Sequence, residues 1–392
     1  MPVNYLTLTQ EIKKLGEQSL QRSVRLSENL NICRELLRQN ASQTRLLEQK
    51  VEEAVARDSG IRCAKPCGEN LDTHRTAQSS DELCTILAAD GSQITPNAHE
   101  PVLFGLVNVG IFRMPLNAGG IPEEFIESEL LYDDRLYANG GLISEDFIAL
   151  QRDVREREKL AELVDHERQL GEAAPIITLT DGPLELYHEP RMDKQFGVMF
   201  ARYLDALDRL SLLGAVTAGY VDRPRADLVV RLLELVEAGS TAEALDERPF
   251  TGVTDLNLFE DLLAPGERSA VFELQSSSTK SYSGKKALHF FYLNVGRQQK
   301  SAIARVEIPA WVAEDAPSLD LLQHVLVDQA HTLGSRPYPY PLLRAHEIAV
   351  VKLDDRDQLT QRIEQELLQQ GFDPFEKSNK QSGKESEPRT RN

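Results

Sequence analysis

Two apolar runs that each end in Asp-Gly constrain what this chain can fold into more than any other feature. The first run is LCTILAADGS at residues 83–92, and the second is PIITLTDGPL at residues 175–184. An apolar run of this length, bounded by turn residues, predicts a buried strand, so Asp90 and Asp181 each lie where a strand ends. Carboxylates on neighbouring strands, about 4.8 Å apart, can share a divalent cation. The alternative is that each Asp-Gly pair only closes a turn.

The composition indicates a globular chain with a sizeable core. The 392 residues are 41% hydrophobic and include four cysteines, too few for a disulfide framework. No stretch reaches the roughly 18 uninterrupted apolar residues of a membrane helix, and the first residues show no basic segment followed by an apolar one. We therefore expect a soluble cytoplasmic protein without a membrane partner.

The charge distribution leaves room for one local nucleic-acid surface. A net charge of −18 argues against a protein that coats nucleic acid with its whole surface. Residues 274–306, however, contain no Asp or Glu. Six cations lie there: Lys280, Lys285, Lys286, Arg297, Lys300 and Arg305. Aromatic rings are interleaved with them at Tyr282, His289, Phe290, Phe291 and Tyr292. Such a mixture is typical of a surface that contacts phosphates and stacks bases, and the alternative is a pair of buried strands with ordinary solvated lysines.

The order of the predicted elements indicates the fold class. Strands at 83–90 and 102–112 come first and are expected to pair antiparallel, with a polar stretch at 123–134 after them. A charged helix at 144–170, capped by Ser144, precedes the strand that ends at Asp181, and further helices and strands alternate beyond it. This order predicts an α/β fold with a mixed sheet flanked by helices. It is also the order of the RNase H-like fold, in which carboxylates of the first and fourth strands meet at the sheet centre.

Five motifs, taken in order, resemble the NurA nuclease family from Leu83 to Val351. They are Asp90-Gly91-Ser92, Asp181-Gly182-Pro183-Leu184, the 219–224 segment GYVDRP, Thr279-Lys280-Ser281 and the 338–347 segment YPYPLLRAHE. The resemblance implies an RNase H-like core that cleaves DNA with manganese, with magnesium as the alternative cation. It also implies a ring-like homodimer that works in archaea beside the hexameric DNA translocase HerA, in DNA repair or end processing.

The same resemblance implies a set of site residues. Asp90 matches the first catalytic aspartate, Asp181 the second, and His346 the late histidine ligand of the metal. A helix glutamate completes the cluster, and Glu156 is favoured because residues 150–156 best resemble the family's Leu-x-Arg-x-x-x-Glu. It also precedes Leu160 by one turn and so can share the face that packs on the sheet. Two other glutamates of this helix stay open as alternatives, Glu158 and Glu162.

The residues expected to bind DNA come partly from the family and partly from the charge pattern. Lys280 resembles a family lysine that meets phosphate. Lys285 and Lys286 lie in the same acid-free segment, and Tyr220 belongs to the third family motif. We therefore expect Lys280, Lys285, Lys286 and Tyr220 to contact DNA.

The sequence pattern and the resemblance together predict how the chain is divided. The apolar pattern of residues 1–60 predicts long amphipathic helices. We expect them to form a helical arm that either dimerises or packs on the protein's own body. A linker follows at 61–80, then a NurA-like nuclease domain at 81–355. A C-terminal helix at 356–371 precedes a tail at 372–392 that we expect to be disordered.

Competing classes fit the residues less well. A haloacid dehalogenase-type phosphatase needs a nucleophilic Asp at the position of Ala88. A P-loop needs Gly at 279 and Ser or Thr at 286, where the chain has Thr279 and Lys286. The remaining rival is a catalytically silent RNase H-like protein that assembles through its helical arm.

Overall fold

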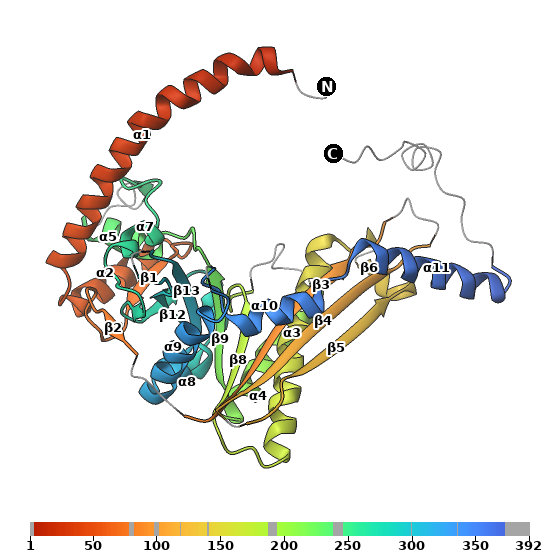
Figure 1. The fold of residues 1–392 in the computed structure, drawn as a ribbon. Coiled ribbons are helices and arrows are strands. Elements are labelled where there is room, and N and C mark those ends of the chain that lie inside the picture. The colour runs from red at the N-terminus through yellow and green to blue at the C-terminus, as the bar shows by residue number, and fades with distance from the viewer. Residues whose placement is uncertain are drawn as a thin grey trace. The chain divides into compact units, whose positions relative to one another are not determined.

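The structure is a computed structural model of the chain. It describes residues 4–77, 82–97, 102–117, 119–138, 141–186, 194–237, 246–298, 300–334 and 336–372. The chain divides into two compact units (Figure 1). Unit 1 comprises residues 1–80, 182–185 and 218–339, and unit 2 comprises residues 81–181, 186–217 and 340–392. The tail expected at 372–392 lies, apart from Phe372, outside the described residues.

Unit 2 contains the sheet predicted from the two Asp-Gly runs. Its strands are β3 (Cys84–Ile94), β4 (Gly105–Leu116), β5 (Glu123–Leu131) and β8 (Ile176–Asp181). They lie in the order β8, β3, β4, β5, with β4 antiparallel to β3, as predicted, and β8 parallel to β3. Three antiparallel strands, a helix and then a strand parallel to the first is the RNase H-like arrangement. The predicted fold class, a mixed α/β sheet flanked by helices, is therefore confirmed.

Strand β5 is the element of this sheet that the sequence analysis missed. Its sequence, EEFIESELL, predicts a polar connection, and most of its side chains are exposed. The strand pairs with β4 along its whole length. It is a strand because of its hydrogen bonds to a neighbouring strand and not because of buried side chains. Its sequence therefore lacks the apolar alternation that predicts a strand.

Helices cover both faces of the unit 2 sheet. The helices are α3 (Glu145–Gln169), α4 (Lys194–Leu212), α10 (Tyr340–Ala349) and α11 (Leu353–Gln369), with the short η1 (Asp133–Leu136) and the hairpin β6 (Tyr137–Ala138) and β7 (Gly141–Leu142). The predicted cap of α3 is confirmed, because the Ser144 hydroxyl accepts the Phe147 N–H at 3.1 Å. Helix α3 packs against β3 and β4, as does α10.

Unit 1 is built on a second group of strands. They are β1 (Cys63–Pro66), β2 (Arg75–Thr76), β9 (Val216–Asp222), β10 (Glu267–Arg268), β11 (Phe272–Gln275), β12 (Leu288–Asn294) and β13 (Ile303–Pro309), and β9 begins in unit 2. Their order is β1, β11, β12, β13, β9, with β10 beside β12 and β2 beside β10. Within the segment 61–80, residues 63–66 and 75–76 form strands, because β1 pairs antiparallel with β11 and β2 with β10.

The helices of unit 1 surround these strands. They are α1 (Tyr5–Gln39), α2 (Thr44–Arg57), α5 (Leu228–Glu237), α7 (Asp255–Glu260), α8 (Ala310–Ala313) and α9 (Ala316–Ala330), together with the short η2 (Thr279–Ser281) and η3 (Gly284–Lys286). The end of α1 packs in the unit through Cys33, Leu36 and Leu37, whereas its side chains described between residues 5 and 25 are exposed. No helix in the described part of the chain is both long and apolar enough to cross a membrane.

One buried carboxylate of unit 1 joins two helices to the strands. Asp255 is fully buried, and its carboxylate accepts the N–H groups of Val229 and Val230 at the start of α5. The Tyr292 hydroxyl donates to the same carboxylate at 2.5 Å. Burial raises the pKa of Asp255 to about 6, even though these three donors oppose the rise. The group therefore binds a proton more readily in the folded protein than in the unfolded chain.

We expect this carboxylate to make stability fall as pH rises. Between its unfolded pKa of 3.8 and its folded pKa of about 6, the unfolded chain ionises first. The free energy of unfolding is therefore highest below the unfolded pKa, and it falls by up to about 3 kcal/mol as pH rises through the folded pKa.

Denaturant titrations of wild type and Asp255→Asn at several pH values, followed by Trp311 fluorescence, measure this difference. Trp311 is the only tryptophan and belongs to the same unit. Asp261→Asn, at an exposed carboxylate, is the control; equal pH profiles for wild type and Asp255→Asn would contradict the expectation.

Candidate active site

The two aspartates of the Asp-Gly runs lie side by side at one end of the unit 2 sheet. Strands β3 and β8 are parallel neighbours, and the last registered pair is Ala89 with Thr180. Asp90 and Asp181 each follow this pair by one residue. Adjacent strands lie about 4.8 Å apart, so the two carboxylates leave neighbouring backbones at the same level. The prediction that both strand ends meet is confirmed.

Both aspartates point to the same face of the sheet. Arg157 of α3 donates to the Thr180 hydroxyl at 2.7 Å, which places the Thr180 side chain on the α3 face. Since side chains alternate along a strand, Asp181 points to the opposite face. Asp90 points there too, because its carboxylate meets α10 on that face. The Asp181 side chain is exposed.

Helix α10 brings His346 to Asp90. The His346 Nδ1 lies 2.7 Å from the Asp90 Oδ2. The helix approaches closely because Gly110 of β4, which is paired with Asp90, has no side chain: a Cβ there would lie 2.6 Å from the Ala349 nitrogen. Sequence reasoning paired these residues only through the family resemblance, and the structure brings them into contact.

Two polar side chains fix the end of α10. The Ser92 hydroxyl donates to the Ala349 carbonyl at 2.5 Å and accepts the Val351 N–H at 3.1 Å. The Asn108 amide donates to the same carbonyl at 2.8 Å. The serine of the Asp90-Gly91-Ser92 motif therefore satisfies the helix end that carries His346, a role that only the tertiary contact reveals. Sequence reasoning missed Ser92, Asn108 and Gly110 as site residues.

Glu156 approaches the same strand from α3, on the other face of the sheet. Its side chain is 6% exposed. A Cβ at Gly91 would lie 2.5 Å from the Glu156 Oε1, so the bare backbone of Gly91 is what admits this carboxylate. Burial raises the pKa of Glu156 well above its usual range; Asp153 and Asp90 add to the rise, whereas Arg152 opposes it. The Arg152 Nε lies 3.4 Å from the Glu156 Oε1.

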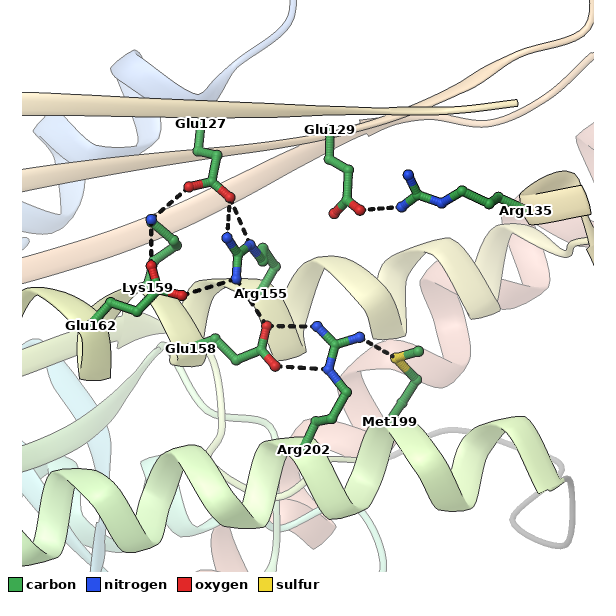
Figure 2. A network of polar contacts seen from close by, with 9 residues as sticks. All are labelled: Glu127, Glu129, Arg135, Arg155, Glu158, Lys159, Glu162, Met199 and Arg202. Atoms are coloured by element: carbon green, nitrogen blue, oxygen red, sulfur yellow. Dashed lines mark hydrogen bonds and ion pairs between the residues drawn. The ribbon is translucent and has the colours of Figure 1, made fainter. Parts of the chain in front are cut away.

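The two alternative helix glutamates belong to an ion-pair network that links α3 to α4 and to β5 (Figure 2). Glu158 accepts two hydrogen bonds from Arg202 of α4, at 2.7 and 2.8 Å. Glu162 pairs with Arg155 at 3.1 Å and with Lys159 at 2.5 Å. Burial alone would raise the pKa of Glu158, but Arg202 and Arg155 hold it below its ordinary value. Both carboxylates are thus engaged by cations away from β3.

The loop after Asp181 is fixed by contacts within unit 1. Glu307 is 1% exposed and accepts the N–H groups of Leu184 at 2.9 Å and of Glu185 at 3.4 Å. A Cβ at Gly219 would lie 2.6 Å from the Gly182 carbonyl oxygen. The glycine of the GYVDRP motif therefore makes room for the Asp-Gly-Pro-Leu loop, which explains in part why both motifs occur together.

The donor groups of the site suit a hard divalent cation, but they are not gathered around one point. Asp90, Asp181 and Glu156 offer carboxylate oxygens and His346 an imidazole nitrogen, the ligand types that manganese and magnesium take. Among the residues that the structure describes, no three His, Cys, Asp or Glu side chains converge as a ready-made metal site. The contact between Asp90 and His346 is the part of the set that is already formed.

The residues expected to contact DNA differ in their exposure. Lys280 in η2 and Lys285 in η3 are exposed, and Lys286 is half-buried. Tyr220 is fully buried and packs edge-to-face on Tyr338 at 5.6 Å between ring centroids. Its ring therefore belongs to the core and is not presented to DNA in this conformation.

The aromatic residues of the acid-free segment are also core residues. Tyr282 is 3% exposed and His289 is 9% exposed, and the other three rings, Phe290, Phe291 and Tyr292, are fully buried. Arg305 is buried against Glu307 at 2.8 Å. The structure therefore supports the alternative of buried strands for β12 and β13. The exposed cations of the acid-free segment are Lys280, Lys285, Arg297 and Lys300.

The chain was compared with protein families and with known proteins. The model of the NurA domain matches residues 84–351, more than half of the chain. A NurA crystal structure is similar with 10% sequence identity and a TM-score of 0.44, over 90% of this chain and 97% of that chain. NurA with manganese is similar with 11% identity and a TM-score of 0.37, over 72% and 89%. The catalytic domain of human Endonuclease V has 15% identity and a TM-score of 0.31, over 82% and 98%. No curated protein matches the chain.

Proposed function

The chain belongs to the NurA family, and from this membership we propose that it is a DNA nuclease that hydrolyses phosphodiester bonds with divalent metal ions. The observation that carries the proposal is the geometry around Asp90. Its carboxylate leaves β3 beside that of Asp181 on β8 and meets the His346 imidazole at 2.7 Å. This arrangement is what a metal-assisted phosphodiesterase needs at the end of a sheet.

We propose Asp90, Asp181, Glu156 and His346 as the metal-binding and catalytic residues. Manganese is the proposed cation and magnesium the alternative, because the donors are oxygen and nitrogen without a thiolate. Cations held there would activate a water molecule and neutralise the charge that develops on the leaving oxygen. They would also draw the carboxylates together, since like charges otherwise keep them apart.

The chain's own residues then have separate tasks. Asp90 orients the His346 ring through Nδ1, which leaves Nε2 to face the substrate side. Gly91 admits Glu156 behind the strand, and Arg152 compensates part of its charge. Glu156 is proposed rather than Glu158 or Glu162, because the latter two already accept hydrogen bonds from Arg202, Arg155 and Lys159.

The wider setting follows from the family. We propose that the protein forms a homodimer, works beside a HerA-type hexameric DNA translocase and acts in DNA repair or end processing in the cytoplasm. Two observations are in agreement. The first half of α1 exposes Ile12, Leu15 and Leu20 in a helix that could meet a second copy, and all four cysteines are free, as expected in a reducing compartment.

The test of the proposed function is a digestion of end-labelled single- and double-stranded DNA. We expect cleavage with manganese, weaker cleavage with magnesium, and none with a chelator or with Asp181→Asn. A wild-type protein that cleaves neither substrate with either metal would support the rival, a catalytically silent protein that assembles through its helical arm.

We expect Lys280 and Lys285 to contribute phosphate contacts to DNA binding. The double variant Lys280→Ala, Lys285→Ala should bind duplex DNA more weakly and with a flatter salt dependence. Each lost contact removes roughly 0.9 from the slope of log K against log salt, so the slope should fall by about 1.8. Fluorescence anisotropy at several salt concentrations, with Asp181→Asn to prevent cleavage, measures this slope.

A second double variant removes the same charge elsewhere. Lys13 and Lys14 are exposed on α1, so Lys13→Ala, Lys14→Ala is a matched control. If this control flattens the slope while the Lys280, Lys285 variant does not, the DNA path follows the N-terminal helix instead. Binding of manganese should be unchanged in both, since neither pair is proposed as a ligand.

A further inference from the structure

A cavity of about 540 Å³ lies in unit 2, beside the ion-pair network of Figure 2. It is lined by the end of β5, by η1 and β6, and by the first turns of α3 and α4. Its size lies within the range of about 300 to 1,000 Å³ that is usual for small-molecule sites. None of the four proposed active-site residues lines it. We call it the α3–α4 pocket.

Cations outnumber carboxylates in the α3–α4 pocket, although the chain as a whole is strongly acidic. Four cationic side chains line it, namely Arg135, Arg155, Lys194 and Arg202, against the two carboxylates of Glu129 and Asp134. Glu158 accepts hydrogen bonds from both Arg155 and Arg202, so these guanidinium groups are held in place before any ligand arrives (Figure 2). Lys194 is exposed and makes no ion pair with any residue that the structure describes. Arg135 is paired with Glu129, so the lining cation that no described carboxylate neutralises is Lys194, and an anion could bind there.

Apolar and amide groups line the rest of the pocket. Tyr137 is 53% exposed and Val198 is 52% exposed, so large apolar surfaces face the solvent there. Phe147 and Met199 lie on the opposite helices, α3 and α4, and Gln151 adds a side-chain amide. An aromatic ring beside a thioether offers a stacking surface, and an amide can hydrogen-bond the edge of a base. An anion alone would need none of these groups.

We propose that the α3–α4 pocket binds one unpaired nucleotide, with its base on Tyr137 and its phosphate at Lys194 and Arg202. The proposal rests on the proposed nuclease function, because that function explains why nucleotides reach this unit. The same chemistry is offered by a nucleotide within a single strand and by a free nucleoside 5′-monophosphate. The pocket lies along α3 at Phe147, Gln151 and Arg155, whereas Arg152 and Glu156 of the same helix face β3, so the site is separate from the cleavage site.

The test is direct binding, measured with the full chain carrying Asp181→Asn and with a chelator present. The probes are thymidine 5′-monophosphate, thymidine, inorganic phosphate and a single-stranded oligothymidylate. Tyr137→Ala and Lys194→Ala are introduced one at a time. Tyr132→Ala is the matched control for the ring, since Tyr132 is 54% exposed in the same unit but does not line the pocket. Lys14→Ala is the control for the charge. Circular dichroism and melting curves show that each variant is folded.

We expect the monophosphate to bind more tightly than thymidine or inorganic phosphate, because the pocket provides for both base and phosphate. Tyr137→Ala should weaken its binding roughly tenfold through a lost base stack, and Lys194→Ala roughly tenfold through a lost charge-assisted hydrogen bond. Both controls should leave binding unchanged. If the variants weaken the oligothymidylate as well, the natural ligand is a strand, and if they weaken only the monophosphate, it is a free nucleotide. Binding of both probes that is insensitive to Tyr137→Ala and Lys194→Ala would overturn the proposal. Because no cleavage is measured, a failure of the nuclease assay would leave this result readable.

Discussion

Asp90→Ala and Asp181→Ala should each abolish manganese-dependent DNA cleavage and leave the protein folded. Both side chains leave the sheet at its end, where β3 and β8 are parallel neighbours, and Asp181 is exposed. Removing either carboxylate takes away a proposed ligand of the metal ions. The charge of these ions would stabilise the transition state. We expect a loss of about a thousandfold or more, the upper range for the loss of one preorganised charge-stabilising group. Initial rates on end-labelled single-stranded DNA measure the effect.

The two variants should differ in one further respect. Asp90 holds the His346 ring at 2.7 Å, so Asp90→Ala also frees α10 from one of its contacts with β3. Asp165→Ala serves as the control and should keep wild-type activity, because this carboxylate on α3 accepts a hydrogen bond from Gln169 of the same helix at 3.0 Å. Wild-type rates in either Asp90→Ala or Asp181→Ala would show that the cleavage site lies elsewhere.

Glu156→Gln should lower the cleavage rate far more than the same change at Glu158 or Glu162. Glu156 is buried behind Gly91, and Asp90 contributes to the rise of its pKa, so its carboxylate lies within electrostatic reach of the site. We expect a loss of about a hundredfold or more, comparable to the removal of one charge-stabilising group. The measurement is the cleavage rate at saturating manganese, with the manganese concentration for half-maximal rate as a second readout.

The same substitution at the other two positions serves as the control. Glu158 and Glu162 form partly exposed ion pairs, which contribute only about 0 to 1 kcal/mol to stability. Their variants should therefore cleave DNA at rates close to wild type and melt at slightly lower temperatures. If Glu162→Gln lowered the cleavage rate most, the helix ligand would lie nearly two turns further along α3. The argument for Glu156 from its place beside Gly91 would then be wrong.

Much of the site's backbone was predictable because the signals are local. An apolar run followed by Asp-Gly predicts a buried strand and the residue at which it ends. Ser144 before a charged helical stretch predicts a helix cap. These patterns correctly predicted β3, β8 and the start of α3. The family motifs predicted His346 as a site residue, and the structure brings its ring to Asp90, 256 residues earlier, although no spacing in the sequence relates the two.

Other features could not be predicted, since they depend on what lies opposite a residue. The residues of β5 become a strand through pairing with β4, and residues 63–66 and 75–76 become strands through pairing with β11 and β10. Tyr220 is an ordinary aromatic in a family motif until the fold buries it against Tyr338. The motif favoured Glu156 over the glutamates at 158 and 162, but only the fold shows which side chains surround each of the three.

The sequence by itself therefore determined the strand ends, the α/β order and the family, because apolar periodicity, turn chemistry and motif order are properties of the chain. The tertiary structure decided which carboxylate faces the sheet and which cations are exposed. It did so through backbone contacts at Gly91 and Gly110, where the absence of a side chain lets α3 and α10 approach β3 and β4 from opposite faces. A glycine in a strand carries no sign of what will occupy the space beside it. Only the packed structure shows that Gly91 admits Glu156 and that Gly110 admits the end of α10, the helix that carries His346.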